Sequence, residues 1–386
     1  ILLPVWLAVF LTAKSAPPKL TLKETDFTSL EGWQAAGHVQ AFSAFIKSCE
    51  KLTPRPGYLI PDGFKNETFA RAFSDACAKA IEGEDFYGGD ADAARTFFEE
   101  AFVPYKMRNG WTRKGKITGY YEPLMEASLE PSPDYPYPLY RAPGDQIRVD
   151  LSKFRNDLTG TIVGRIEGNS FLPYYTRRDI DEGAFNGKGL EILYARDPID
   201  VYFLQVQGSG RARLPDGRII GVGYAGKNGH ANTLAGRTLV QTGEMEIEEV
   251  SMQSIRQWFK DNPARIFEIL HKDDSYVFFT LTGGDGPFGS SGAELTPEHS
   301  LAIDPTFAPM GLPIFIDGEI PTLDNPDEFE PLRQLLIAQD TGGAIKGAIR
   351  GDVFWGRGEK ATYLAGYMNN EATFTLLLPR GALGDD

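Results

Sequence analysis

From about residue 111 onward, the chain consists of short apolar runs separated by glycine and proline. Each run is rich in β-branched and aromatic residues, which is typical of short strands. Many short strands pack most readily as small β-barrels, because closing a sheet removes its exposed edges. The predicted strands are Ile117–Tyr121, Val201–Val206, Arg218–Val222, Tyr276–Leu281, Leu312–Ile316, Gln334–Gln339 and Thr373–Leu378.

Residues 20–107 have a different pattern, since apolar side chains recur at the spacing of one helix face and glycine is rare. A further helix is predicted in the strand-rich part, where Asn262 provides a cap and Pro263 the first turn. Five prolines within residues 130–145 indicate an extended connection. The chain is therefore expected to be a β-rich α+β protein with N-terminal helices.

The two cysteines, Cys49 and Cys77, each lie on the apolar stripe of a predicted helix. Two such helices packed together would bring the sulfur atoms within bonding range, and an oxidising compartment would allow a disulfide. Two buried free thiols, acting as small apolar side chains, are the alternative. Both remain open, and export of the protein would favour the disulfide.

Residues 1–13 carry no charge and have the length of a signal-peptide core, which is shorter than a membrane span. The pair Pro17-Pro18 follows and blocks a continuing helix. We expect residues 1–19 to be a signal-peptide-like segment that exports the protein, with an apolar helix packed on the body as the alternative. Because no cysteine lies near this run, we expect no lipid anchor.

Composition excludes several classes of protein. The 386 residues include 39 basic and 53 acidic side chains, and the net charge of −14 argues against a nucleic-acid-binding surface. Two cysteines and four histidines offer little for a zinc site. A hydrophobic content of 42% is ample for a packed core.

The run Gly284–Gly289 (GDGPFG) matches the letters of the dinucleotide-binding fingerprint. Its proline stands where the phosphate-binding helix should begin, and no apolar helix pattern follows. We interpret the run as a glycine-rich loop or hinge and reject a nicotinamide-dependent enzyme. No serine lies in a G-x-S-x-G pattern, so serine-hydrolase chemistry is not indicated either.

Three aspartates, Asp304, Asp340 and Asp352, lie at the ends of apolar strands beside glycine or proline. Converging at one end of a barrel, they would have split pKa values, as acid–base catalysis requires. Aspartate beside glycine is also ordinary turn chemistry, so one such residue alone carries little weight. Asp352 is distinctive because the apolar residues 353–355 would solvate it poorly and help it to hold its proton.

Residues 205–237 combine many glycines with amide, hydroxyl, aromatic and basic side chains. Sugar-binding clefts use such groups, since amides and hydroxyls bind sugar hydroxyls and aromatic rings stack on sugar faces. The basic residues in this segment of an acidic protein suit an anionic, non-nucleic ligand. Candidate substrate contacts are Gln207, Ser209, Tyr224 and Lys227, together with Tyr121 and Glu122 from an earlier strand end.

Seven stretches occur in one order over most of residues 110–370. They are GYYEP (119–123), VQGSG (206–210), GYAGKNGHA (223–231), SMQSIRQW (251–258), SYVFF (275–279), AIDPTFAPMG (302–311) and DTGGAIKGAIRGDVFWG (340–356). Together they resemble the membrane-bound lytic transglycosylase A family of peptidoglycan-cleaving enzymes. The carboxyl-terminal part also resembles the 3D domain, whose three aspartates match Asp304, Asp340 and Asp352.

The resemblance implies a double-psi β-barrel catalytic domain made of residues 20–123 and 286–386, with the N-terminal helices packed on it. A smaller β-barrel domain, residues 124–285, is inserted and forms the other wall of a glycan groove. The implied reaction cleaves the β-1,4 bond between N-acetylmuramic acid and N-acetylglucosamine, as the muramic C6 hydroxyl attacks C1 and leaves a 1,6-anhydro ring. One acid suffices, because the nucleophile is tethered to the substrate.

By the same match, Asp352 is the acid/base and Asp340 is a partner that orients the site or supports the charge at C1. Asp304 would assist at the same site or hold a barrel turn. We expect no cofactor and no metal. The expected partners are peptidoglycan glycan strands and other cell-wall enzymes.

Two features depart from the family. Its better-known members are outer-membrane lipoproteins, whereas this chain is expected to be a periplasmic, envelope-associated protein without that anchor. One extra residue also lies between Lys346 and Asp352 relative to some relatives. Two other functions remain open: a hydrolytic muramidase, in which Asp340 or Glu122 activates water, and a non-catalytic glycan-binding protein.

Overall fold

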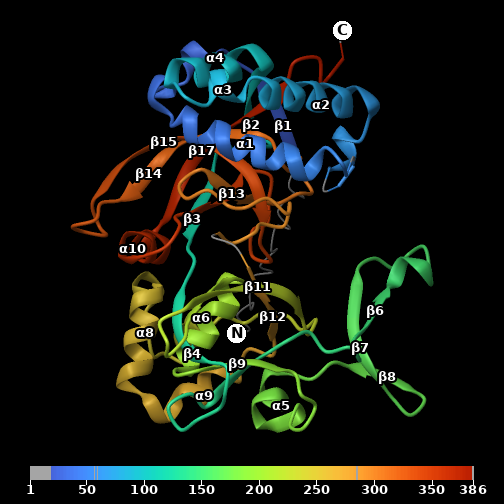
Figure 1. Cartoon of the computed structure of the whole chain (residues 1–386), viewed down its shortest axis with the longest axis vertical. Coiled ribbons are helices and arrows are strands. Elements are labelled where there is room, and N and C mark those ends of the chain that lie inside the picture. The colour runs from blue at the N-terminus through green and yellow to red at the C-terminus, as the bar shows by residue number, and fades with distance from the viewer. Residues whose placement is uncertain (1–18, 56, 59, 284–285, 385–386) are drawn as a thin grey trace, which may run out of the picture.

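The computed structural model describes residues 19–55, 57–58, 60–283 and 286–384. Figure 1 shows two lobes, one above the other, with the C-terminus in the upper lobe. The predicted signal-peptide-like segment lies outside the described residues except for Lys19, as does the start of the run Gly284–Gly289. In the described part of the chain, no helix has the length and apolar character that a membrane crossing requires.

Six strands form a closed β-barrel in the upper lobe. The β13–β15 and β16–β3 pairs are parallel, and the other neighbours are antiparallel. This barrel confirms the predicted α+β fold class. Around the ring the order is β3 (Lys114–Tyr120), β17 (Asn369–Pro379), β14 (Pro313–Pro321), β15 (Phe329–Thr341), β13 (Ser300–Ile303) and β16 (Arg350–Phe354), which pairs again with β3.

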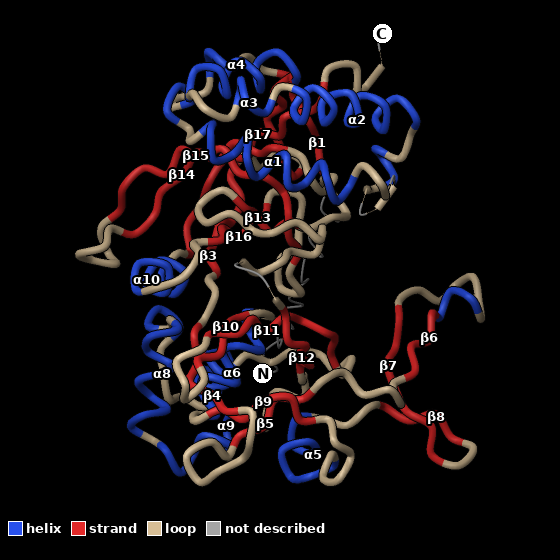
Figure 2. Tube along the Cα trace, in the orientation of Figure 1, coloured by secondary structure: helices blue, strands red, loops and turns tan. Residues whose placement is uncertain are grey.

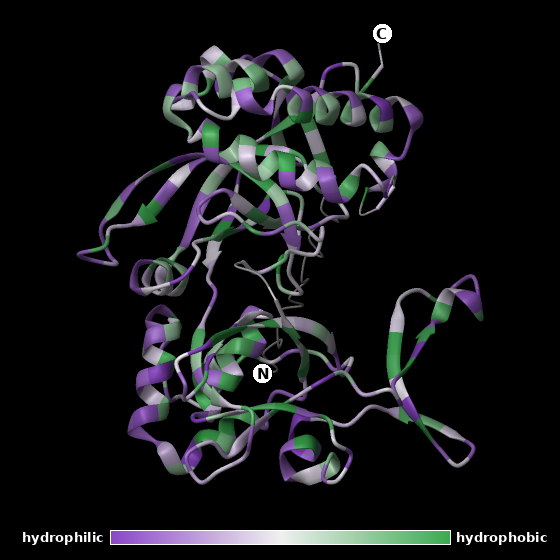
Figure 3. Ribbon diagram, in the orientation of Figure 1, coloured by the Kyte–Doolittle hydropathy of each residue, from purple (hydrophilic) through white to green (hydrophobic). Residues whose placement is uncertain are grey.

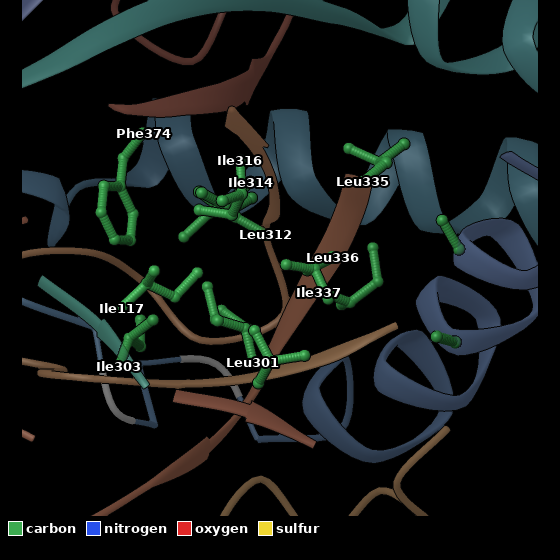
Figure 4. Packing of buried hydrophobic residues seen from close by; sticks show 14 of the residues in the cluster. Ile117, Leu301, Ile303, Leu312, Ile314, Ile316, Leu335, Leu336, Ile337 and Phe374 are labelled. Carbon is green, nitrogen blue, oxygen red and sulfur yellow. The ribbon is translucent and has the colours of Figure 1, made fainter. Parts of the chain in front are cut away.

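Branched aliphatic side chains fill the barrel. Figure 4 shows Ile117, Leu301, Ile303, Ile314 and Ile337 converging from strands β3, β13, β14 and β15, and each is at most 3% exposed. Since alternate residues of a strand point to opposite faces, Lys116 and Thr118, on either side of Ile117, point away from this interior.

The N-terminal region covers one side of the barrel with helices, as predicted, but its two ends are strands. β1 and β2 pair with each other, and β2 also pairs with β17, so both lengthen the barrel sheet. Helical prediction is wrong there because pairing with the sheet decides the conformation of these short segments. The elements are β1 (Leu20–Glu24), α1 (His38–Leu52), α2 (Glu67–Glu82), α3 (Glu84–Tyr87), α4 (Ala91–Ala101) and β2 (Phe102–Asn109).

A disulfide bond joins Cys49 of α1 to Cys77 of α2. Of the two states that the sequence left open, the structure has the bonded one. Linking residues 28 positions apart restricts the unfolded chain, which stabilises the folded state by about 3.6 kcal/mol in the chain-entropy description. The bond fixes the helical layer that lies on the barrel.

A buried glutamine attaches α1 to the barrel. Gln339 of β15 donates from Nε2 to the carbonyl oxygen of Ala44 and to Ser48 Oγ, both at 2.9 Å. Its Oε1 accepts a hydrogen bond from Ser300. All the polar atoms of this side chain are thus engaged, and the strand end that carries Asp340 is held in place.

The lower lobe contains a second, six-stranded sheet. It has its own apolar core, which includes Met125, Leu139, Leu193, Leu204 and Phe279. The strand order is β12 (Val277–Thr282), β11 (Ile219–Lys227), β10 (Gly210–Arg213), β4 (Leu124–Ser128), β9 (Glu191–Ala195) and β5 (Tyr137–Tyr140).

One predicted strand in this lobe is wrong, because Val201–Val206 lies in helix α6 (Pro198–Gln207). Asp197 caps this helix by accepting from the backbone N–H of Ile199 at 2.8 Å, and Pro198 occupies the first turn. The helix is buried on most sides, so its sequence lacks the period that marks a surface helix.

Further helices lie in the lower lobe and at the contact between the two lobes. The predicted helix after Asn262 is present, as a single turn followed by α9. Gln253 of α8 donates to the carbonyl oxygen of Thr362 in α10 at 3.2 Å, which joins the lower lobe to the barrel. These helices are α7 (Ala235–Gln241), α8 (Met252–Asp261), α9 (Ile266–Leu270) and α10 (Glu359–Tyr367), and the three-residue α5 is Arg177–Asp179.

A three-stranded antiparallel sheet projects sideways from the lower lobe. It consists of β6 (Ile147–Asp150), β7 (Thr161–Glu167) and β8 (Ser170–Pro173). Figure 2 shows that loops connect it to the rest of the lobe. We call this sheet, with its connecting loops, residues 146–173, the arm.

Candidate active site

The barrel places Asp340 and Asp352 on the same side of neighbouring strands. Asp340 lies near the end of β15 and Asp352 lies in β16, and both pair with Ala302 of β13 between them. Paired residues point to one face of a sheet, and these alternate with Leu301 and Val353, which belong to the buried core. The two carboxyl groups are therefore presented on the outer side of the barrel.

Asp352 is held by a short chain of hydrogen bonds. It accepts from the hydroxyl of Thr118 on β3, and the Thr118 oxygen accepts from Arg350 Nη2 at 2.7 Å. Burial raises the pKa of Asp352 to about 6, against the opposing effects of Thr118 and Arg350, and the charge of Asp340 raises it further. Such a group can donate a proton near neutral pH and take one back as the carboxylate.

Asp340 is surrounded by hydrogen-bond donors. Its Oδ1 accepts from the backbone N–H groups of Ser290 and Thr341, each at 2.8 Å. Its Oδ2 accepts from the hydroxyl of Tyr120 at 3.1 Å. Burial raises the pKa of Asp340, whereas these donors favour its charged form. The arrangement suits a fixed negative charge beside Asp352.

The glycine-rich run Gly284–Gly289 contributes to this environment. Gly289 packs so closely on β15 that an added Cβ would lie 2.3 Å from the carbonyl oxygen of Gln339. Only glycine allows this approach, which brings the N–H of Ser290 to Asp340. Residues 286–299 form no helix, as the interpretation of the run as a loop requires.

Glu122 lies where the chain leaves the barrel for the lower lobe, and its carboxylate is buried. It accepts from Arg211 Nε of β10 at 2.9 Å and lies 3.7 Å from Arg357 Nε, which follows β16. Burial raises the pKa of Glu122 although both arginines act against it. The ion pairs connect the lobes, and a carboxylate engaged in this way is poorly placed to activate water.

Tyr121, Gln207 and Ser209 lie close to the same crossover. The backbone N–H of Tyr121 donates to Gln207 Oε1 at 3.3 Å, and the Tyr121 side chain is buried. Ser209 is partly buried and directly precedes β10, where the backbone N–H of Arg211 donates to the carbonyl oxygen of Pro123 at 2.7 Å. These three predicted contacts therefore gather at the junction of the lobes.

Tyr224 and Lys227 lie on β11 of the lower lobe. The Tyr224 side chain is 53% exposed, and a bulge between Tyr224 and Gly226 changes the direction of the strand. Lys227 ends the strand and is exposed. These two residues form a second group of predicted contacts, on a different sheet from the aspartates.

The carboxylate of Asp304 accepts hydrogen bonds from groups of the surrounding loops. Its Oδ1 accepts from the N–H and hydroxyl of Thr306, and its Oδ2 accepts from the N–H of Gly347 at 2.9 Å. These bonds hold together the turn after β13 and the loop that follows β15. We assign Asp304 to the turn rather than to the substrate.

Sequence reasoning missed three side chains that complete the site: Thr118, Tyr120 and Arg350. The signal that could have found them is strand alternation. Thr118 and Tyr120 lie on one face of β3, whereas the next residue, Tyr121, is buried in the core. Arg350 has the same two-residue spacing from Asp352 on β16.

Two further features of the structure concern the binding of ligands. Over the described ranges, no group of three or more histidine, cysteine, aspartate or glutamate side chains is arranged to hold a metal ion. A hollow of about 510 Å³ lies beside Trp355 and Leu364 of α10, next to the β14–β15 hairpin, and none of the predicted site residues lines it.

Comparison with known families matches two regions of the chain. Residues 116–280 match the MltA specific insert domain, and residues 299–378 match the 3D domain. Among curated proteins, membrane-bound lytic murein transglycosylase A of Vibrio cholerae is 33% identical over 264 residues, which cover 67% of this chain and 64% of that protein. The Escherichia coli K12 protein of the same name is 32% identical over 289 residues, which cover 73% and 70%.

Solved structures give the same result over more of the chain. A membrane-bound lytic murein transglycosylase from Agrobacterium tumefaciens superposes with a TM-score of 0.80 at 34% identity and covers 93% of this chain and 98% of its own. MltA from Neisseria gonorrhoeae gives 0.77 at 32% identity, covering 95% and 93%. Escherichia coli MltA with bound chitohexaose gives 0.66 at 25% identity, covering 93% and 94%.

Proposed function

Since this chain belongs to the membrane-bound lytic murein transglycosylase A family, we propose that it cleaves the β-1,4 bond between N-acetylmuramic acid and N-acetylglucosamine in peptidoglycan. The product on the muramic side is a 1,6-anhydro ring, because the C6 hydroxyl of the same sugar is the nucleophile. Water takes no part in this reaction.

One arrangement carries the proposal: Asp352 is partly exposed on the outer side of the barrel, burial raises its pKa to about 6, and Thr118 is the side chain that donates to it. Asp340 is surrounded by three donors, Asp304 is used by its turn, and Glu122 is paired with two arginines. A hydrolase needs a second carboxylate as nucleophile or base, whereas the anhydro-forming reaction needs only one acid.

In the proposed mechanism, protonated Asp352 donates its proton to the glycosidic oxygen as the bond to C1 breaks. The resulting carboxylate takes the proton of the C6 hydroxyl as that oxygen bonds to C1. Asp340 lies beside it as a negative charge that supports the positive charge developing at C1. Because C6 and C1 belong to one sugar ring, the attack is intramolecular and fast for entropic reasons.

We further propose that the two lobes are separate domains, one made of residues 20–123 and 286–386 and the other of residues 124–285. The glycan lies between them. Two groups of predicted contacts support this path, one at the crossover (Tyr121, Gln207, Ser209) and one on β11 (Tyr224, Lys227). The chitohexaose in the Escherichia coli relative is an oligosaccharide of the same backbone type.

The compartment and partners follow from the same chemistry. The substrate and the name of the relatives assign the protein to the cell envelope. We propose the periplasm, reached through the apolar N-terminal segment, and association with other enzymes that act on the same glycan. The disulfide Cys49–Cys77 fits an oxidising compartment.

The rate of cleavage should depend on pH through Asp352. Its pKa is raised to about 6 and the protonated form is the active acid, so kcat/KM is expected to fall as pH rises above 6, by about tenfold per pH unit. The measurement is release of soluble fragments from isolated peptidoglycan between pH 4.5 and about 8, with the protein's thermal stability followed over the same range. A rate that increases from pH 6 to about 8 would show that a base, not this acid, limits the reaction.

A further inference from the structure

The arm presents one entirely apolar face. In the β6–β7–β8 register, Ile147 pairs with Gly164, Val149 with Ile162, and Ile166 with Phe171, so all of these lie on the same side of the sheet. Pro173 pairs with Gly164 and completes the face. The exposed large side chains of this face are Ile147 (39%), Ile162 (42%), Ile166 (54%) and Phe171 (37%).

The opposite face of the arm is the one that contacts the protein. Val163 lies against Gly229, where an added Cβ would be 2.5 Å from it. Arg165 stacks on the ring of Tyr175 at 4.0 Å. Because these contacts use the second face, the apolar face is directed away from the lower lobe, and Figure 3 shows apolar residues along these outlying strands.

The tip of the arm carries a further exposed aromatic side chain, which lies between two basic residues in the sequence. Phe154 is 72% exposed, and Lys153 and Arg155 flank it. Residues 146–173 contain four basic and three acidic side chains, a net charge of +1, whereas the whole chain has −14. Two of these basic side chains are ion-paired within the arm, Arg155 with Asp157 and Arg165 with Glu167. The small positive excess makes the arm the part of this acidic protein that an anionic surface repels least.

The exposed apolar area of the arm helps to decide what kind of partner it binds. At roughly 200 Å² per fully exposed large side chain, Phe154 and the four exposed residues of the face present about 500 Å². This is at the upper end of the apolar patches found on soluble proteins, which are often functional. It is below the ~800 Å² per partner that a stable protein interface buries, so a second copy of the chain is the poorer candidate.

We propose that the arm is a membrane-contact element, which lays its apolar face and Phe154 into the interfacial region of a bilayer that contains anionic lipid. Protein segments that bind the interfacial region of a bilayer combine aromatic and aliphatic side chains with lysine and arginine. The proposal concerns attachment and does not depend on the glycan chemistry. It would hold the lower lobe at a lipid surface.

The test uses an environment-sensitive nitrobenzoxadiazole label on the full-length protein. Since Cys49 and Cys77 are bonded to each other, a Phe154→Cys variant offers one reactive thiol. With vesicles of phosphatidylethanolamine and phosphatidylglycerol, the label at 154 is expected to brighten severalfold and shift to the blue. The control is Phe86→Cys on α3, whose side chain is equally exposed (69%) and whose label should not change.

A second variant tests the face itself. Ile162→Ser with Ile166→Ser is expected to lower vesicle partitioning by about tenfold or more, because two exposed apolar side chains no longer enter the interface. Thermal stability and glycan cleavage should remain unchanged. An unchanged label at 154 with vesicles overturns the proposal. A label response without vesicles would also overturn it. If a higher protein concentration alone brightens the label, the arm binds a second copy of the chain, and if added peptidoglycan alone does so, the arm binds glycan.

Discussion

Replacing Asp352 by asparagine is expected to lower the rate of peptidoglycan cleavage by about 10³-fold or more, because the glycosidic oxygen then has no proton donor. Asparagine has the same shape and keeps an oxygen that accepts from Thr118, so the site remains folded. The folded-state pKa of Asp352 lies above its ordinary value of 3.8, and this carboxyl therefore costs stability as pH rises from about 4 to above 6. The variant should be at least as stable as the parent at neutral pH.

The measurement is single-turnover release of fragments, with binding to isolated glycan strands as the second readout. Asp304→Asn is the matched control, since it changes another strand-end aspartate of the same barrel. Its carboxylate holds a turn, so we expect cleavage within about threefold of the parent and a loss of about 1 kcal/mol in the free energy of unfolding. If Asp352→Asn still cleaves at the parental rate, Asp352 is not the acid.

Asp340→Asn is expected to lower kcat by about 10²-fold with little change in KM, because it removes a fixed charge that supports the charge at C1. The asparagine oxygen still accepts from the N–H groups of Ser290 and Thr341, so the loop stays in place. The charge of Asp340 also raises the pKa of Asp352. Its removal should therefore move the fall in kcat/KM to a pH below 6.

The pH shift separates an electrostatic role from a structural one. Tyr120→Phe is the matched control, since it removes one donor to Asp340 and leaves the charge. It should reduce kcat only severalfold and leave unchanged the pH at which kcat/KM begins to fall. An Asp340→Asn variant with reduced kcat and an unmoved profile would indicate that Asp340 positions the loop and does not act through its charge.

The sequence predicted the barrel because its strands are short, apolar and separated by glycine. It failed at Val201–Val206, where a helix buried on most sides has the composition of a strand. It also failed at β1 and β2, because β1 pairs with β2 and β2 pairs with β17, a segment more than 250 residues away in the chain. Contacts between distant segments cannot be read from local periodicity.

The site shows the same limit. Asp340 and Asp352 could be predicted because strand ends, glycine and a family resemblance all indicated them. Strand alternation places Thr118 and Tyr120 on one face of β3, but their contact with the aspartates depends on the parallel pairing of β3 with β16, which lies far away in the chain. Glu122 was predicted at the substrate, but its two arginine partners come from different lobes and appear only in the folded chain.

The central claim is that the bond is broken without water by a single acid. It is tested most directly by mass spectrometry of the soluble fragments released from isolated peptidoglycan, with Asp352→Asn alongside. We predict muropeptides that end in 1,6-anhydromuramic acid from the parent and none from the variant. Fragments with hydrated reducing ends would contradict the claim, because they require a second carboxylate to activate water.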